Sequence, residues 1–278
     1  MAVKDMDERE FFFGHKACAG CGGSIAVRIA LKVIGMRAVA VLPAGCMSAV
    51  GFNFPQLAFA NNAFIAPFAA TASVMTGIEA GLRRRGITDA PVVGFAGDGG
   101  TADIGLQALS GALDRGDNIL YICYDNEAYM NTGIQKSGLT PLGARTTTTP
   151  VHGNRRAKKD MMAIVAAHGV PYAASASVGY LDDYIRKLKK AAAIRGPRYI
   201  HVFAPCPTGW GIATDETVEI AREAVDVGLW PLREFENGEW TVNRVPSRPQ
   251  DLLEHLKRQR RFSTLNTDNL EEIKNASR

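Results

Sequence analysis

The stretch "VVGFAGDGGTADIG", residues 92–105, decides the fold. It opens on an almost continuous apolar run, which is typical of a strand that is buried on both faces of a parallel sheet. The run leads into "GDGG", residues 97–100, and then into a helix pattern. Glycine lets a backbone approach phosphate oxygens closely, and the first amides of a helix point towards such oxygens. The stretch therefore predicts a platform for a diphosphate group, with the carboxylate of Asp98 in its middle.

On both sides of this stretch, strand patterns alternate with helix patterns. Apolar residues at helical spacing predict helices, and short apolar runs predict strands. The predicted helices cover residues 22–35, 66–86, 101–116, 161–169 and 180–196, and the predicted strands cover residues 37–45, 90–97, 118–126, 172–178 and 198–206. Such alternation predicts an α/β fold in which a mostly parallel sheet is flanked by helices.

The last part of the chain is more polar than the rest. We expect residues 1–210, which carry the alternating elements, to form one α/β domain. Residues 211–278 would be a C-terminal extension with helices and a hairpin at "FENGEWTV", residues 235–242, packed on the domain or on partner subunits. The basic runs "RRR" at 83–85 and "KRQRR" at 257–261 are interpreted as solvated helix faces.

The composition is typical of a soluble globular protein, with 46% hydrophobic and 22% charged residues among 278. A net charge of +4 is too small to indicate a nucleic-acid partner. The N-terminal segment lacks the apolar core of a signal peptide, and no window approaches the length of a membrane span. We therefore expect a cytoplasmic protein without a membrane partner, in which five cysteines favour a metal or catalytic role over disulfides.

Unusual residues follow three of the predicted strands, at the edge where parallel sheets bind ligands. These are "PAGC" at 43–46, "GDGG" at 97–100 and "YDNEAYMNTG" at 124–133. Each could be no more than a tight turn, because short motifs of this kind are weak when taken alone. Their common position at one sheet edge favours a binding site.

A magnesium ion is expected at this edge, because Asp98 would otherwise repel a phosphate group. Mg²⁺ is held by a few carboxylate or amide oxygens together with the phosphates of its ligand. Asn126 follows Asp98 by 28 positions, which is enough for one helix and one return strand. Its amide oxygen could coordinate the ion, and the Ala128 carbonyl could add another ligand.

Four of the cysteines have surroundings typical of metal ligands. Cys18 and Cys21 form a C-x₂-C pair, Cys46 lies in "PAGCM", and Cys206 precedes a proline in "FAPCPTGW". Spacing alone leaves a structural zinc site and an iron–sulfur cluster open, because both accept four thiolates. Cys123, inside the apolar "LYICY", is expected to be a plain core residue.

Two sets of motifs resemble those of a known family. Gly-Asp-Gly, followed just under thirty residues later by an asparagine, resembles the signature of thiamin diphosphate (TPP) enzymes. With "GHKACAGCG" at 14–22 and "APCPTGW" at 204–210, the chain closely resembles the β subunit of the 2-oxoacid:ferredoxin oxidoreductases, the pyruvate synthase group. The similarity runs from about Phe13 to Trp210.

The resemblance implies a TPP-binding fold of the PP type in residues 1–210, which would also bind iron and sulfur, and it assigns the site. The Mg²⁺ ligands would be Asp98, Asn126 and the Ala128 carbonyl, and Asn131 would donate to the keto oxygen of the substrate. The residues implied to border the cofactor are Gly45, Cys46, Gly97, Asp98, Gly99, Gly100, Asn126, Ala128, Asn131 and Thr132. The residues implied to hold one [4Fe–4S] cluster are Cys18, Cys21, Cys46 and Cys206.

The reaction implied by the resemblance is oxidative decarboxylation of a 2-oxoacid, with pyruvate as the first choice, to acyl-coenzyme A and CO₂. TPP serves as the electron sink, and the cluster would pass electrons on to ferredoxin. No glutamate is found that could activate TPP, so a partner subunit would supply it, and another would carry ferredoxin-type clusters. The chain alone is therefore expected to be inactive.

Two features depart from the pyruvate-specific pattern and leave alternatives open. Arg145 could suit oxalate or a dicarboxylic 2-oxoacid, although a contact with solvent or a partner is slightly favoured. Phe52, Phe54 and Phe59 could line a pocket for an aryl 2-oxoacid, although core packing is the commoner role. A branched 2-oxoacid, a non-redox TPP enzyme with structural zinc, and a subunit that only relays electrons are further alternatives. No catalytic role is assigned to His15, His152, His168 or His201.

Overall fold

The computed structural model describes residues 6, 8–265, 270 and 273. The remaining residues of the predicted N-terminal segment and C-terminal extension lie outside this description. Among the described residues, no helix combines the length and the apolar character that crossing a membrane requires.

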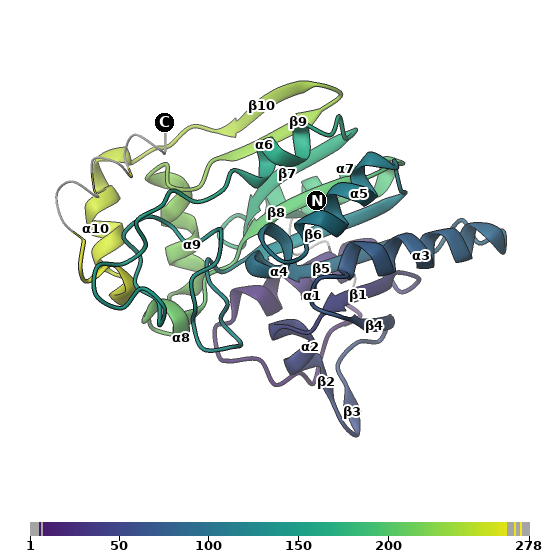
Figure 1. Ribbon diagram of the computed structural model, residues 1–278, viewed down its shortest axis with the longest axis horizontal. Helices are drawn as coiled ribbons and strands as arrows, with labels where there is room; N and C mark the ends of the chain where they lie inside the picture. Colours follow the sequence, from purple (N-terminus) through teal and green to yellow (C-terminus); the bar gives the residue numbers. More distant parts are fainter. Residues whose placement is uncertain (1–5, 7, 266–269, 271–272, 274–278) are drawn as a thin grey trace.

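One large sheet runs through the molecule (Figure 1), with the strand order β10-β9-β7-β8-β6-β5-β1-β4. Six neighbouring strands are parallel, namely β7, β8, β6, β5, β1 and β4. β9 and β10 continue the sheet beyond β7 in antiparallel pairing. The prediction of an α/β fold with a mostly parallel sheet is confirmed. The strands are β1 (Val39–Pro43), β4 (Asn62–Ala66), β5 (Val92–Gly97), β6 (Ile119–Asp125), β7 (Tyr172–Ser177), β8 (Arg198–Phe203), β9 (Leu232–Glu236) and β10 (Glu239–Arg244).

Helices cover both faces of this sheet (Figure 1). One hydrophobic core includes residues of α1 (Gly22–Ile34), α7 (Leu181–Ala193) and α9 (Thr217–Asp226). A second core includes residues of α3 (Thr71–Arg84), α5 (Leu106–Asp114) and α6 (Met161–Ala166). The shorter helices are α2 (Cys46–Gly51), α4 (Asp98–Ala102), α8 (Pro207–Trp210), η2 (Pro249–Asp251), α10 (Leu252–Lys257) and η3 (Arg260–Phe262).

The central strands supply side chains to both cores. Along β5, Val93 and Phe95 enter the core of α1, whereas Val92 and Ala96 enter the core of α3. Successive side chains of a strand point to opposite faces, so an apolar run such as this one fills both layers. Because both faces of β5 are buried, the run that precedes "GDGG" has no polar side chain.

The helix predicted over residues 101–116 is wrong as a single element. α4 begins directly at Asp98, and the chain leaves helical geometry at Asp103, where ψ is −93°. At Gly105 a Cβ atom would lie only 2.0 Å from the carbonyl oxygen of Gly100. Close packing of these two backbone segments therefore breaks the helix before α5 begins, and only glycine fits at position 105.

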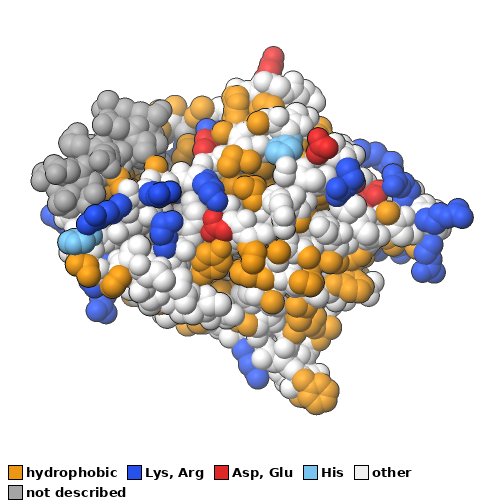
Figure 2. Space-filling model, viewed as in Figure 1, with side chains coloured by type: hydrophobic (Ala, Val, Ile, Leu, Met, Phe, Trp, Pro, Cys, Tyr) orange, Lys and Arg blue, Asp and Glu red, His pale blue; other side chains and the backbone are white. Residues whose placement is uncertain are grey.

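The sequence patterns also missed two features beside β1. Residues 62–66 form the edge strand β4, which pairs with β1. β2 (Phe52–Asn53) and β3 (Gln56–Leu57) form a hairpin that projects from the domain (Figure 1). Phe54 is fully exposed there, and a hydrophobic side chain stands at the tip of this projection (Figure 2).

The C-terminal extension joins the fold in two places. Its predicted hairpin is confirmed as β9 and β10, and β9 pairs with β7, so the hairpin extends the main sheet. Leu256 and Phe262 form a small third core with Ala144 of the long loop after β6. The extension is therefore less peripheral than its polar composition indicated, while a domain boundary at residue 210 stays a prediction.

Candidate active site

The carboxyl ends of β1, β5 and β6 meet at one edge of the sheet and enclose a pocket. All ten residues that the sequence implied for cofactor binding line it, together with Pro43, Ala44, Phe68, Tyr124, Tyr129 and Met130. The parallel register makes this possible, because Gly97 at the end of β5 is paired with Tyr124 near the end of β6. The three motifs that are distant in sequence thus form one site.

Oxygen atoms from the loops after β5 and β6 converge beside this pocket. The amide group of Asn126 lies 3.0 Å from Asp98 Oδ1 and 2.8 Å from the Ala128 carbonyl oxygen, with its own oxygen facing both. Three acceptors this close repel each other unless the amide turns to donate from nitrogen or a cation lies between them. Oxygens around an octahedral Mg²⁺, each about 2.1 Å from the ion, are spaced by roughly the same distance. The donor types, a carboxylate, an amide and a carbonyl, therefore fit this ion.

Asp98 is held rigidly in place. Its side chain is 2% exposed, and the Ser137 hydroxyl donates a hydrogen bond to Asp98 Oδ2. Burial raises the pKa of Asp98 well above its usual value, and the nearby charge of Asp125 adds to this effect. The ring of Tyr129 packs against the next residue, Gly99, and occupies the place that a Cβ there would need. A cation at this point would relieve the repulsion between the carboxylates.

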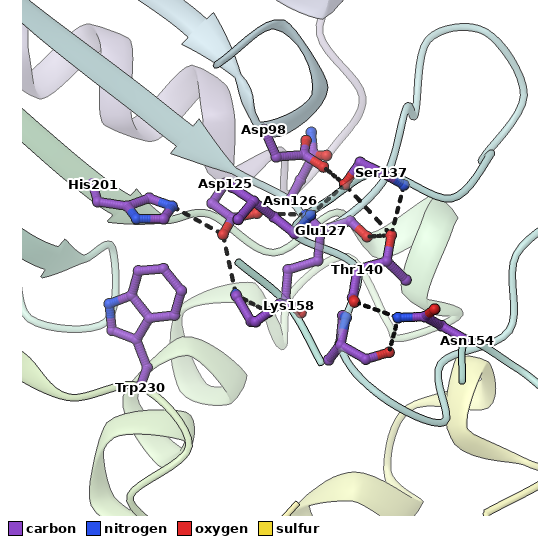
Figure 3. A network of polar contacts seen from close by, with 12 residues as sticks. Asp98, Asp125, Asn126, Glu127, Ser137, Thr140, Asn154, Lys158, His201 and Trp230 are labelled. Carbon is purple, nitrogen blue, oxygen red and sulfur yellow. Dashed lines mark hydrogen bonds and ion pairs between the residues drawn. The ribbon is translucent and has the colours of Figure 1, made fainter. Parts of the chain in front are cut away.

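A buried polar network surrounds the loop after β6 (Figure 3). Asp125 accepts from the backbone N–H of Glu127 at 2.9 Å, and it lies 3.2 Å from Lys158 Nζ and 3.0 Å from His201 Nε2. Burial alone would raise the pKa of Asp125, but Lys158 and His201 outweigh it and hold the pKa below its usual value. The carbonyl of Glu127 accepts from Thr140 Oγ1 at 2.7 Å. These contacts fix the backbone on both sides of Asn126.

The four predicted cluster cysteines lie on loops that meet beside the pocket. Cys21 directly precedes α1, Cys46 begins α2 and lines the pocket, and Cys206 directly precedes α8. The loop of Cys21 touches that of Cys206, since the N–H of Gly22 donates to the Pro205 carbonyl at 3.1 Å.

The four thiols are within electrostatic reach of one another. Burial raises the pKa of Cys46 to about 12, and Cys21 and Cys206 add to this effect. The pKa of Cys206 rises to about 11 for the same reason, with further contributions from Cys21 and Cys18. In the described part of the chain, however, no three Cys, His, Asp or Glu side chains are close enough together to hold one metal ion. The four thiols are thus neighbours, but they do not converge on the position of a single metal ion.

Comparison with known proteins identifies the family. Residues 43–202 match the family described as "Thiamine pyrophosphate enzyme, C-terminal TPP binding domain". The chain is 51% identical to pyruvate synthase subunit PorB of Methanothermobacter marburgensis, over 93% of this chain and 91% of the relative. It is 50% identical to ketoisovalerate oxidoreductase subunit VorB of Pyrococcus horikoshii, over 96% of this chain and 89% of the relative. The chain belongs to the β subunits of the 2-oxoacid:ferredoxin oxidoreductases.

The fold of this β subunit has a counterpart among solved structures. A chain of the 2-oxoglutarate:ferredoxin oxidoreductase from Magnetococcus marinus superposes with a TM-score of 0.61 at 20% identity, over 91% of this chain and 92% of that chain. At this level of identity the likeness concerns the fold alone, and it agrees with the predicted TPP-binding architecture.

The residues that depart from the pyruvate-specific pattern lie away from the pocket of the β subunit. Arg145 is exposed and donates to the Pro150 carbonyl at 2.9 Å and to Ser263 Oγ at 3.2 Å. Phe52 and Phe59 pack on each other with ring centres 5.5 Å apart, and Phe54 is exposed on the hairpin. None of these four residues lines the pocket, so the suggested contacts with an extra carboxylate or an aryl group have no support in its walls.

Two functional neighbours escaped the sequence analysis. The indole N–H of Trp210 donates to the Asn126 carbonyl at 2.8 Å, and the guanidinium of Arg261 lies over the Trp210 ring. Arg261 is only 6% exposed, so the interpretation of "KRQRR" as a solvated helix face is wrong for this residue. Nothing in the local pattern marks Arg261, because its partners come from distant loops.

The remaining cysteine and histidines have structural surroundings. Cys123 lies within β6 and is fully buried in the core, as predicted. His201 pairs with Asp125 behind the pocket, His168 bonds Ser110 at 2.8 Å, and His15 stacks on Phe12. None of the three histidines lines the pocket.

Proposed function

We propose that this β subunit binds TPP through a magnesium ion held by Asp98, Asn126 and the Ala128 carbonyl. The observation that carries the proposal is the meeting of these three groups at the pocket wall, where the Asn126 amide lies 3.0 Å from Asp98 Oδ1 and 2.8 Å from the Ala128 carbonyl oxygen. Two of them come from one loop and the third from its neighbour, so the ion would also tie the loops together. Asp98 and Asn126 provide hard oxygen ligands, which Mg²⁺ prefers.

The backbone of residues 97–100 would border the diphosphate. A Cβ at Gly99 would lie 2.2 Å from the Tyr129 ring, and a Cβ at Gly100 would lie 3.2 Å from Phe68. Glycine at both positions lets the two rings close around the pocket without a clash. Asn131 and Thr132 line the pocket and are exposed, which supports contacts of these side chains with cofactor and substrate.

We further propose that Cys18, Cys21, Cys46 and Cys206 hold one [4Fe–4S] cluster next to TPP. Support comes from the mutual electrostatic effect of these thiols and from Cys46, which belongs to both sites. Each cysteine of such a cluster binds a different iron, so the four thiols need not converge on one ion as they would around zinc.

The proposed reaction is oxidative decarboxylation of a 2-oxoacid to acyl-coenzyme A and CO₂, with ferredoxin as the electron acceptor. TPP supplies the electron sink for the decarboxylation. Asn131 would donate to the oxygen of the keto group, where negative charge develops. Pyruvate is the first candidate substrate, and ketoisovalerate is the second, because relatives named for each share about half of the residues of this chain.

Partner subunits would complete the site. No glutamate occurs among the residues that line the pocket, although TPP requires one at its aminopyrimidine ring. A partner subunit would supply this glutamate, and another would carry ferredoxin-type clusters to the acceptor.

The test is to purify the complex without oxygen and to measure TPP, magnesium, iron and sulfide. Coenzyme A-dependent reduction of a dye is then followed with pyruvate and with ketoisovalerate. We expect turnover by the complex, none by the isolated chain, and loss of TPP in Asp98→Ala. Zinc in place of iron would contradict the cluster, and turnover by the isolated chain would contradict the shared site.

A further inference from the structure

Glu127 lies between the two proposed Mg²⁺ ligands of the loop after β6, and its backbone is left-handed, with φ of 65°. A residue with a Cβ adopts this conformation only against a steric cost, so other contacts must hold it there. The hydrogen bonds of its backbone to Asp125 and Thr140 provide part of this support. The left-handed turn directs Asn126 and the Ala128 carbonyl towards one point.

The side chain of Glu127 is held by two cations. Its carboxylate forms ion pairs with Lys158 at 2.8 Å and with Arg261 at 2.6 Å. The Lys158 side chain is 28% exposed, whereas that of Arg261 is 4% exposed. Removing Arg261 would leave this buried carboxylate with one of its two cations, which is unfavourable. The conformation of Glu127 thus depends on Arg261 as well as on Lys158, whose Nζ donates to Glu127 Oε1 at 2.8 Å.

The same guanidinium lies against Trp210. Its central carbon is 3.5 Å from the centre of the Trp210 ring, which is a cation–π contact. Trp210 donates its indole N–H to the Asn126 carbonyl at 2.8 Å and its backbone N–H to the Cys206 carbonyl at 2.9 Å. Arg261 therefore contacts Glu127 in the loop after β6, and it also contacts Trp210, which is hydrogen-bonded to the loop of Cys206.

We propose that Arg261 is a positioning residue that couples the two metal-binding loops of this β subunit. Through Glu127 it holds the turn that carries Asn126 and Ala128, and through Trp210 it holds the loop of Cys206. The inference rests on the proposed function, in which these loops bind Mg²⁺ with TPP and an iron–sulfur cluster. Arg261 does not line the pocket, so its effect on cofactors is exerted through these two side chains.

The first test is Arg261→Met in the anaerobically purified complex, with Arg260→Met as the control. Arg260 is an exposed cation at the adjacent position, so the control removes the same charge and keeps the ion pair with Glu127 and the contact with the Trp210 ring, both of which belong to Arg261. We expect Arg261→Met to weaken TPP binding at fixed Mg²⁺ by about tenfold, the usual effect of losing a residue that orients a metal ligand. We also expect faster release of iron to a chelator. Titration calorimetry and iron release measure both effects, and Arg260→Met should match the wild type.

A second variant separates positioning from general loss of stability. In Glu127→Gly with Arg261→Met, glycine adopts the left-handed conformation at little cost, and the carboxylate that has lost one of its two cations is gone. We expect TPP affinity to recover towards the wild-type value, whereas iron release stays fast because Trp210 still lacks its cation.

Three outcomes would overturn the inference. They are wild-type binding and iron release in Arg261→Met, equal losses in Arg260→Met and Arg261→Met, and a double variant that binds TPP as weakly as Arg261→Met. If the wild-type complex itself binds no TPP with Mg²⁺, the proposed function fails instead. The two failures are therefore distinguishable.

Discussion

The proposed magnesium site and the proposed cluster site are neighbours, yet they are built in different ways. Asp98, Asn126 and Ala128 are at most 7% exposed, and hydrogen bonds and ion pairs fix the loops that carry them. Cys18 is exposed, and the other three cysteines are half-buried at helix ends.

The two proposed sites also differ in what fixes the geometry of their ligands. A hard cation in a small octahedral site needs its oxygens in place beforehand, and here the side chains of the chain itself hold them. Thiolates are commonly drawn into their final geometry by the metal that they bind. We therefore expect the magnesium site to respond to small changes in its supporting residues, and the cluster site to respond to the loss of a ligand.

The largest expected effect is that of Asp98→Ala. It removes the one carboxylate among the proposed ligands, and we expect TPP affinity at fixed Mg²⁺ to fall by at least about 100-fold. Titration calorimetry measures this, with the exposed Asp114→Asn as a control that should bind normally. Iron content should stay unchanged in both variants. Loss of iron together with TPP would mean that the two sites do not form independently.

A smaller effect is expected for Ser137→Ala, which removes the hydroxyl that donates to Asp98 Oδ2. An unpaired buried acceptor costs about 1–3 kcal/mol, so TPP affinity should fall by roughly tenfold. The control is Ser110→Ala, which removes a comparable hydrogen bond, to His168, outside the pocket. Normal binding in Ser137→Ala would show that the magnesium site does not depend on its supporting hydrogen bonds.

For the cluster site, Cys18→Ser should leave TPP affinity within about twofold of the wild type. This change is smaller than the roughly tenfold loss expected when a residue that supports the magnesium site is changed. Iron and sulfide content should fall, and the remaining cluster should be lost quickly in air, because Cys18 is the most exposed of the four thiols. Metal analysis and visible absorbance measure this change. Cys123→Ala, in the core, should keep its iron. Unchanged iron in Cys18→Ser would remove this residue from the ligand set.

The smallest effect concerns the ion pairs of Glu10, which hold the segment before Cys18 to α1. Hydrogen bonding to Arg28, supported by Lys32, lowers the pKa of Glu10 from 4.5 to about 2. A lowered folded-state pKa stabilises the protein above pH 4.5, and this contribution is lost as the pH falls towards 2. Because the pair is solvent-screened, Glu10→Gln should cost at most about 1 kcal/mol at neutral pH.

Chemical unfolding of the full chain measures this contribution. The difference between wild type and Glu10→Gln should shrink below pH 4.5 and also in high salt. A difference that persists under acid and in salt would contradict the view that the cysteine region is held by exposed ion pairs.

Much of the fold and the candidate site could be predicted from local patterns. The apolar run of β5, the residues "GDGG" and the spacing to Asn126 predicted the parallel sheet and three of the residues that line one pocket, Asp98, Asn126 and Ala128. The other cofactor-binding residues were implied by the family resemblance. The break between α4 and α5 could not be predicted, because it comes from the close approach of Gly105 to Gly100. Arg261 could not be found either, since an arginine in a basic run looks solvated until its partners are known.

By itself, the sequence determined the sheet, the strand ends at which ligands bind and the choice of oxygen and sulfur donors. These properties depend on periodicity and on residue types at short spacing, and both can be recognised within a short segment of the chain. Only the tertiary structure decided that the polar groups of Asp98, Asn126 and Ala128 meet at one place, and that Arg261 is buried between Glu127 and Trp210. Such contacts join residues that are distant along the chain, and a buried charge is stable only where folding brings its partners to it.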